Sequence, residues 1–209
     1  MSKGGRIMTK NFLAVIRENR SWLVLAFLFF LGGVALSYSA LTQKPELITL
    51  LEENLMAALQ DLGEEIFNVS ALKGVMLLIV NNIFATAQII FLGIFLGIPT
   101  LISAIANGSV LGILAFQLTQ EGVAPIPFLL AGVIPHGIFE LPAFFVSVAL
   151  GLKLGYHVVF PLPNLSRKES LRVIFQEISI SLPFIFGLLL VAAFIEIFIT
   201  PHFLNLLPV

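Results

Sequence analysis

The sequence predicts an all-α membrane protein: a polytopic bundle of about five transmembrane helices, with an amphipathic helix on its outer surface. Of its 209 residues, 58 % are hydrophobic and only 11 % are charged, and the mean hydropathy is +1.05. A water-soluble domain of this length could not bury so large an apolar fraction in one core. The apolar residues also gather in five long runs, each near the roughly 20 residues that a helix needs to cross a bilayer. We therefore expect one integral membrane domain over residues 1–209.

The first apolar run follows basic residues, as the core of a signal peptide does, but it is too long for one and no small-residue cleavage site leads into a soluble domain. We expect it to stay in the protein as a helix. The second run is interrupted near Gly93, Gly97 and Pro99, so the second and third helices should be joined by almost no loop or form a re-entrant segment. The five predicted transmembrane helices are about 22–41, 72–98, 100–118, 126–152 and 178–200.

The basic residues indicate the orientation of the chain. Five of the eleven Lys and Arg residues precede the first helix and four more lie between the fourth and fifth. Because cytoplasmic segments carry the excess of Lys and Arg, we expect a cytoplasmic N-terminus and, after five crossings of the cell membrane, a C-terminus outside. These residues are Lys3, Arg6, Lys10, Arg17, Arg20, Lys153, Arg167, Lys168 and Arg172.

Three charged residues near the predicted membrane boundaries are given a structural interpretation: Glu177 and Glu196 are interpreted as solvated or snorkelling, and Lys153 as a topology signal. Lys153 is read as one of the topology signals. Glu177 is expected at the inner interface, and Glu196 about 6 Å below the outer end of the last helix, where its side chain can reach the headgroups. None of the three is predicted to belong to a functional site.

The largest segment expected outside the bilayer is an amphipathic helix over about residues 46–67. Leu and Ile recur there at spacings of three or four, which places them on one face of a helix, and Glu and Asp fill the remaining positions. One interpretation is a surface helix that packs on the bundle or lies in the headgroup layer. The other is a docking helix that binds a protein partner through residues 46–66. An acidic helix is a poor electrostatic match for anionic lipid.

Five polar residues stand inside the predicted membrane helices. With a rise of about 1.5 Å per residue, those on the second, third and fourth helices lie roughly 14–21 Å below the outer ends. An unpaired polar group in hydrocarbon costs several kcal/mol, so we expect these side chains to converge near the midplane and to bind one another or water. The predicted intramembrane polar cluster is Asn81, Asn82, Asn107, His136 and Glu140.

The most polar stretch of the fourth helix is PHGIFELPA, residues 135–143. His136 and Glu140 are four residues apart and therefore share a helix face. Pro135 and Pro142 each lack an N–H and displace the carbonyl four residues earlier, which predicts two kinks in a helix over 126–152. Irregular backbone at membrane depth is tolerated only where it is buried in protein or lines a cavity.

Small residues at a spacing of four predict where helices approach closely. One such stripe contains Ala104, Gly108 and Gly112, and another contains Gly93 and Gly97. A third stripe, in GLKLG, contains Gly151 and Gly155. The positions that we assign to helix breaks and close packing are Gly93, Gly97, Pro99, Gly108, Gly112, Pro135, Gly137 and Pro142.

The order of these motifs resembles the stage II sporulation protein M family of integral membrane proteins. The motifs are NN (81–82), GxxxG (93–97), NGSVLG (107–112), PHGIFELPA (135–143) and GLKLG (151–155), over roughly residues 75–160. The resemblance implies a multi-helix membrane protein without established enzyme activity. In spore formers it implies a membrane anchor for a cell-wall-degrading complex during engulfment, with peptidoglycan hydrolases as partners. The family's motif positions fall on Asn81, Asn82, Asn107, Gly108, Pro135, His136, Gly137 and Glu140.

Three functions fit these residues. The first is a non-catalytic scaffold, whose polar cluster fixes the register of the helices. The second is a channel or transporter with Glu140 as a proton or cation site and His136 as its relay, because intramembrane ionisable residues and broken helices mark transport sites. The third is an intramembrane metal-dependent enzyme. His136 and Glu140 supply only two ligands of the three or more that a site needs, and His157 and His202 lie at other depths.

We accordingly expect no catalytic residue, no cofactor and no metal site. The chain has no cysteine, which excludes disulfides and thiolate ligands. The expected partners are the lipid bilayer, proteins on the outer face through residues 46–66, and a second copy of the chain if a glycine stripe dimerises. Nucleic acid is excluded because the cytoplasmic basic residues are few and are explained by topology.

Overall fold

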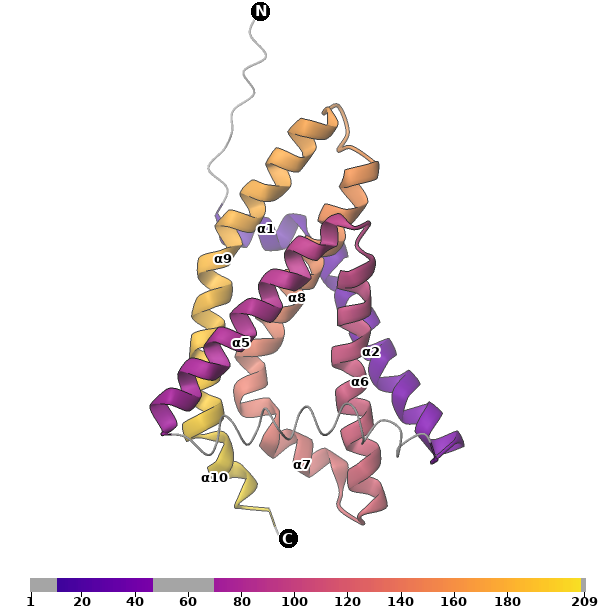
Figure 1. Cartoon of the computed structure of the whole chain (residues 1–209), viewed down its shortest axis with the longest axis vertical. Helices are drawn as coiled ribbons and strands as arrows, with labels where there is room; N and C mark the ends of the chain where they lie inside the picture. Colours follow the sequence, from indigo (N-terminus) through magenta and orange to yellow (C-terminus); the bar gives the residue numbers. More distant parts are fainter. Residues whose placement is uncertain (1–10, 47–69, 208–209) are drawn as a thin grey trace, which may run out of the picture.

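The computed structural model describes residues 11–46 and 70–207, and every regular element within these ranges is helical (Figure 1). The all-α prediction is therefore confirmed. The predicted amphipathic helix over 46–67 lies outside the described residues apart from its first position. The elements are α1 (Phe12–Glu18), α2 (Arg20–Gln43), α5 (Ala71–Phe91), the 3₁₀ turn η2 (Leu92–Ile94), α6 (Ile98–Gln120), α7 (Pro125–Gly132), α8 (Ile134–Val159), α9 (Arg167–Phe198) and α10 (Thr200–Leu204).

Five of these helices are long and apolar enough to cross a membrane. Their outward faces carry large apolar side chains, such as Phe84 and Val80, which are 64 % and 65 % exposed. A soluble protein does not leave so much contiguous apolar surface in water, whereas lipid solvates it. The protein is a multi-pass membrane protein. The five spans are Arg20–Gln43, Ala71–Ile94, Ile98–Gln120, Ile134–Val159 and Arg167–Phe198.

The predicted helix over 126–152 is wrong, because two helices occupy this stretch. α7 ends at Gly132 and α8 begins at Ile134, with Val133 between them. Pro135 stands in the first turn of α8, where its missing N–H would have had no partner in any case. Of the two prolines in this stretch, Pro135 therefore begins a helix and Pro142 lies inside it. α8 starts eight residues later than predicted, which changes the depth of every side chain on it.

The last helix begins about eleven residues before the predicted start at 178. Ser166 caps α9, since its side chain accepts from the Glu169 N–H while the Glu169 carboxylate accepts from the Ser166 N–H. This reciprocal pair satisfies two backbone donors that a helix start otherwise leaves free. α9 continues through Pro183 to Phe198 and brings residues near its end back to the level where α8 starts.

The connection between α5 and α6 is as short as predicted. Gly97 adopts a left-handed backbone with φ of 73°, which glycine tolerates best, and Pro99 stands in the first turn of α6. Each helix is long enough to cross a bilayer separately. This favours two spanning helices joined by a tight turn over a re-entrant segment.

Two glycine stripes pack directly against each other, as their spacing predicts. A Cβ at Gly155 of α8 would collide with backbone atoms of Gly93 and Gly97, and one at Gly93 would collide with the backbone of Gly151. Side chains are absent on both sides of this contact, so the turn between α5 and α6 lies against the second half of α8. The prediction of close packing at Gly93 and Gly97 is confirmed.

The remaining stripe joins α6 to α2. A Cβ at Gly108 or Gly112 would collide with α2 backbone oxygens, those of Phe30 and Val34 respectively. Gly137 differs, because a Cβ there would meet only side chains, at 3.5 Å or more. Ordinary van der Waals contact needs no glycine, so the close-packing role predicted for Gly137 is wrong.

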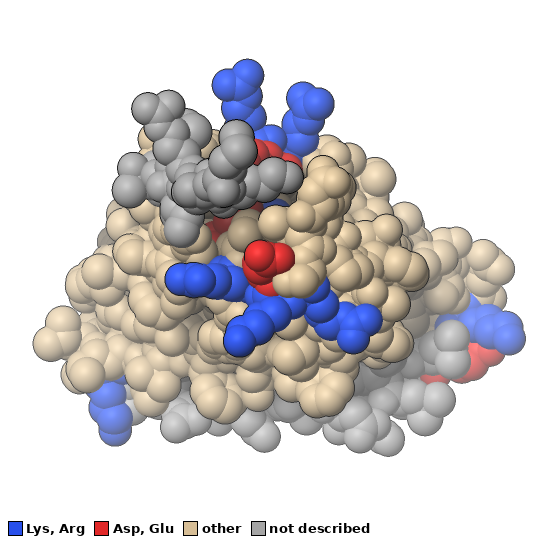
Figure 2. Space-filling model, turned by 90° about the horizontal axis from the view of Figure 1, so that it is seen from above, with Lys and Arg blue, Asp and Glu red and all other residues tan. Residues whose placement is uncertain are grey.

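One end of the bundle is basic. Figure 2 shows Lys and Arg side chains gathered on the end seen from above, where α8 joins α9 in Figure 1. Trp22, near the start of α2, packs its ring 5.6 Å from that of Tyr156, near the end of α8, so α2 begins at this end. We call this the basic end. Its exposed basic residues are Arg17, Arg20, Arg167, Lys168 and Arg172.

Candidate functional site

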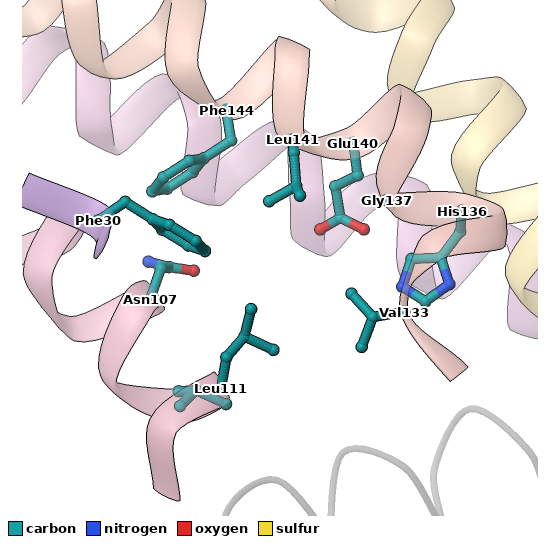
Figure 3. Close-up of a pocket in the computed structure, with 10 residues that line it drawn as sticks. Phe30, Asn107, Leu111, Val133, His136, Gly137, Glu140, Leu141 and Phe144 are labelled. Carbon is teal, nitrogen blue, oxygen red and sulfur yellow. The ribbon is translucent and has the colours of Figure 1, made fainter. Parts of the chain in front are cut away.

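A pocket of about 260 Å³ lies among α2, α6 and α8 (Figure 3). Three of the five residues of the predicted polar cluster line it: Asn107, His136 and Glu140. Asn107 is exposed, and the other two are partly buried. The remaining wall is apolar apart from one glycine. It consists of Phe30, Val110, Leu111, Val133, Gly137, Leu141 and Phe144.

The pocket lies closer to the α7 end of the bundle than the sequence predicts. Because α8 begins at Ile134, His136 falls in its first turn and Glu140 in its second. Glu140 is then about 9 Å along the helix axis from the start of α8, where an unbroken helix over 126–152 placed it at about 21 Å. The break at Val133 therefore moves the carboxylate away from the predicted midplane and toward the end opposite the basic end.

Glu196 joins the two α8 residues and was missed by the sequence analysis. His136, Glu140 and Glu196 each offer one ligand atom, and these atoms all lie within 4.8 Å of one another. Glu196 is partly buried near the end of α9, so the prediction of a solvated side chain at the headgroups is wrong. On an unbroken helix over 126–152, the depth assigned to Glu140 differed from that assigned to Glu196. The two carboxylates lie at one level in the structure, so the sequence did not predict that they meet.

The imidazole of His136 is held by the start of α10. Its Nδ1 lies 3.3 Å from the hydroxyl oxygen of Thr200, and that hydroxyl donates to the carbonyl oxygen of Ile195, also at 3.3 Å. When the hydroxyl donates its proton to the Ile195 carbonyl, its oxygen is left to accept from Nδ1–H. This tautomer leaves Nε2 with a free lone pair. Figure 3 shows one ring nitrogen of His136 and the Glu140 carboxylate facing the same open region beside Val133.

Asn81 and Asn82 do not belong to the pocket, so this part of the predicted cluster is wrong. The α5 face that packs in the bundle carries Val75 and Leu78, which are buried. Asn81 lies off that face and is exposed, and its amide lies 3.4 Å from the side-chain oxygen of Asn82. Apolar residues occur on both faces of α5. Their spacing in the sequence therefore does not reveal which face packs in the bundle, or on which face Asn81 lies.

A second polar centre lies near the basic end. The ammonium of Lys153 on α8 is 2.6 Å from a carboxylate oxygen of Glu177 on α9, and the two side chains are only 8 % and 1 % exposed. The amide of Asn19, at the junction of α1 and α2, donates to the same oxygen at 3.1 Å. The predictions that Lys153 is a topology signal and Glu177 a solvated residue are wrong. We call these three residues the buried ion network.

A signal for this network was present in the sequence. Lys153 stands within GLKLG, six residues before α8 ends, and Glu177 stands ten residues after α9 begins. Opposite charges at comparable distances from one connection can meet across adjacent antiparallel helices. A charge inside an apolar bundle requires such a partner, because desolvating it alone costs several kcal/mol.

An aromatic cluster separates the two polar centres. The ring of Phe30 on α2 lies 6.0 Å from that of Phe144 and 5.4 Å from that of Phe145, both on α8. Along α8, these residues come one turn after Glu140 and two turns before Lys153. Phe30 and Phe144 also line the pocket, so they form its wall on the side of the basic end.

Comparison with known proteins identifies the family. A model described as Stage II sporulation protein M matches residues 25–201, which include both polar centres apart from Asn19. An uncharacterized protein of Methanocaldococcus jannaschii is 34 % identical over 131 residues, a stretch that is 59 % of this chain and 69 % of that relative. No solved structure matches the chain. The chain belongs to the stage II sporulation protein M family.

Proposed function

We propose that this protein is a channel or transporter that binds a small cation at His136, Glu140 and Glu196, the first two of which line the pocket. The observation that supports the proposal is that a carboxylate oxygen of Glu196 lies within 4.8 Å of ligand atoms of His136 and Glu140, two residues that line the pocket. In the part of the chain that the structure describes, neither carboxylate forms an ion pair with Lys or Arg. Two carboxylates that converge in an apolar bundle are costly unless a proton or cation balances them.

The aromatic cluster supports the same proposal. It closes the pocket toward the basic end, while Asn107 at the pocket's edge is exposed. A transporter needs a site that is accessible from one side and closed to the other. In this arrangement Phe30, Phe144 and Phe145 form the barrier that a bound cation must pass.

The proposed orientation places the basic end in the cytoplasm. Arg and Lys residues gather there, as the distribution of positive charge in membrane proteins predicts. The N-terminus would then be cytoplasmic and the C-terminus outside. The pocket would lie in the outer half of the bundle, reached from outside the cell.

A flux assay tests this function. The full chain is reconstituted in liposomes that contain a pH-sensitive or cation-sensitive dye, and flux is measured for wild type, Glu140→Gln and Glu196→Gln. Either substitution removes a charge while it keeps the shape of the side chain, so flux should fall. Glu121→Gln is the matched control, since Glu121 is exposed beyond the end of α6 and lies outside the pocket. Flux that is equal in all four proteins contradicts the proposal.

A second candidate is a non-catalytic scaffold or anchor for a membrane-associated complex, in spore formers one that remodels the cell wall. The buried ion network favours it, because one carboxylate joins α8, α9 and the junction of α1 and α2 and so holds the bundle in a single arrangement. The docking segment would be residues 46–66, which fall almost wholly outside the described residues. Deletion of 46–66 should then abolish co-purification of the complex, and Glu140→Gln should leave it intact.

A further inference from the structure

We propose that His136, Glu140 and Glu196 bind a divalent transition-metal ion, with one imidazole nitrogen and two carboxylate oxygens as ligands. The inference rests on the proposed function, because it names the class of cation that the same three residues bind. The sequence offered only two ligands on one helix face. The structure supplies a third from α9, so an ion here would join α8 and α9.

The spacing of the ligand atoms fits a single ion. Zn²⁺ lies about 2.0–2.2 Å from nitrogen and carboxylate ligands, so two ligand atoms in a tetrahedral site are separated by roughly 3.3–3.6 Å. The three candidate atoms lie within 4.8 Å of one another. Small rotations of the two glutamate side chains close this difference, and neither is fixed by a hydrogen bond to a described residue.

The histidine is oriented as a metal-binding histidine requires. Metal-bound imidazoles usually donate their second N–H to an oxygen acceptor, which fixes the ring and its tautomer. Thr200 provides that acceptor for Nδ1 of His136, and the carbonyl of Ile195 holds the Thr200 hydroxyl in turn. Nε2 is then the nitrogen that is free to bind an ion. This contact comes from α10, an element independent of the three proposed ligands.

Charge selects a dication over a monovalent one. Two ionised carboxylates and a neutral imidazole carry a charge of −2, which one divalent ion neutralises. A single Na⁺ bound to the two ionised carboxylates would leave a net charge of −1 in an apolar bundle, where uncompensated charge is costly. The imidazole favours Zn²⁺, Fe²⁺ or Ni²⁺ over Mg²⁺ and Ca²⁺, which prefer oxygen ligands alone.

Zn²⁺ binding to the purified full chain tests the inference. The protein is stripped with a chelator, and Zn²⁺ and Mg²⁺ are titrated separately by calorimetry in detergent. We expect one Zn²⁺ per chain with little Mg²⁺ binding, and a loss of affinity of at least about a hundredfold in Glu196→Gln. Thr200→Val keeps the shape but removes the contact to Nδ1, and should weaken binding about 10–100-fold. Glu121→Gln should bind as wild type does.

The controls separate the metal site from the transport function. Thermal unfolding of each stripped variant shows whether it is folded before titration. Zn²⁺ binding that persists in both Glu196→Gln and His136→Gln would be adventitious and would overturn the inference, as would the absence of binding to wild type. Flux sensitive to Glu140→Gln in metal-free buffer, without Zn²⁺ binding, would overturn the metal site and leave transport standing. Zn²⁺ binding without flux of any cation would support the metal site and contradict the transport function.

Discussion

At the scale of single residues, the buried ion network pairs two opposite charges inside the bundle. Lys153 and Glu177 are nearly inaccessible, and Asn19 shares the carboxylate with the ammonium. The attraction in such a pair roughly offsets the cost of desolvating both charges, so the pair adds little net stability. Removal of one partner is different, because it leaves the other charge buried and unpaired.

This asymmetry gives a stability prediction. Glu177→Gln and Lys153→Met should each lower the free energy of unfolding by about 3–5 kcal/mol, whereas the double variant should lose less than the sum of the two. Denaturant unfolding in detergent measures the three values. Arg172→Gln, an exposed change at the same end of the bundle, serves as the control. Single variants as stable as this control would show that the pair is not buried in the protein.

At the scale of helices, backbone contact between glycines determines which pairs lie closest. Gly33 of α2 faces the Ile105 carbonyl of α6, and an added Cβ would collide with it. Gly32, the adjacent residue, has no atom within 4 Å of such a Cβ. Gly32 is therefore a matched control for Gly33, because only Gly33 lies at a position that a side chain could not occupy.

The substitution Gly33→Ala should destabilise the bundle by about 1–3 kcal/mol, the usual cost of overpacking. Gly32→Ala should be neutral or slightly stabilising, because alanine favours a helix over glycine by about 1 kcal/mol. Thermal unfolding of the two variants in the same detergent gives the comparison. Equal melting temperatures would mean that α2 and α6 do not approach as closely as the structure shows.

The aromatic contact between α2 and α8 gives a second prediction at this scale. Phe144→Ala removes a ring from the wall between the pocket and the basic end, so the flux through reconstituted protein should rise or lose its selectivity for the bound cation. Phe194→Ala on the exposed face of α9 is the control, since that ring lines no wall of the pocket. Flux unchanged by Phe144→Ala, in a protein that remains folded, would exclude these rings as the barrier.

At the scale of the whole molecule, the orientation can be tested because the chain contains no cysteine. Lys168→Cys places a single thiol at the basic end, and Glu121→Cys places one beyond the opposite end of α6. In intact cells, a membrane-impermeant thiol reagent should label Glu121→Cys and should label Lys168→Cys only after permeabilisation. The reverse pattern would place the basic end outside.

Much of the fold follows from the sequence, because hydrophobic length and glycine spacing are local properties. The number of spans, the tight turn before α6 and the close packing of Gly93 and Gly97 were all predicted. The break at Val133 was not, since Pro135 predicted a kink within one long helix and not the start of a new one. From that single error follow the wrong depth of Glu140 and the missed contact with Glu196, which lies 56 residues later in the chain. Which residues of two helices meet depends on the residue at which each helix begins.

The central claim is that the carboxylates of Glu140 and Glu196 bind a transported cation. The most direct measurement is the ratio of cation flux through Glu140→Gln to flux through Glu121→Gln, both reconstituted at the same protein density. We predict a reduction of at least about tenfold, which corresponds to roughly 1.4 kcal/mol in the barrier to cation passage. A ratio of one, from two proteins with the same unfolding temperature, would contradict the account.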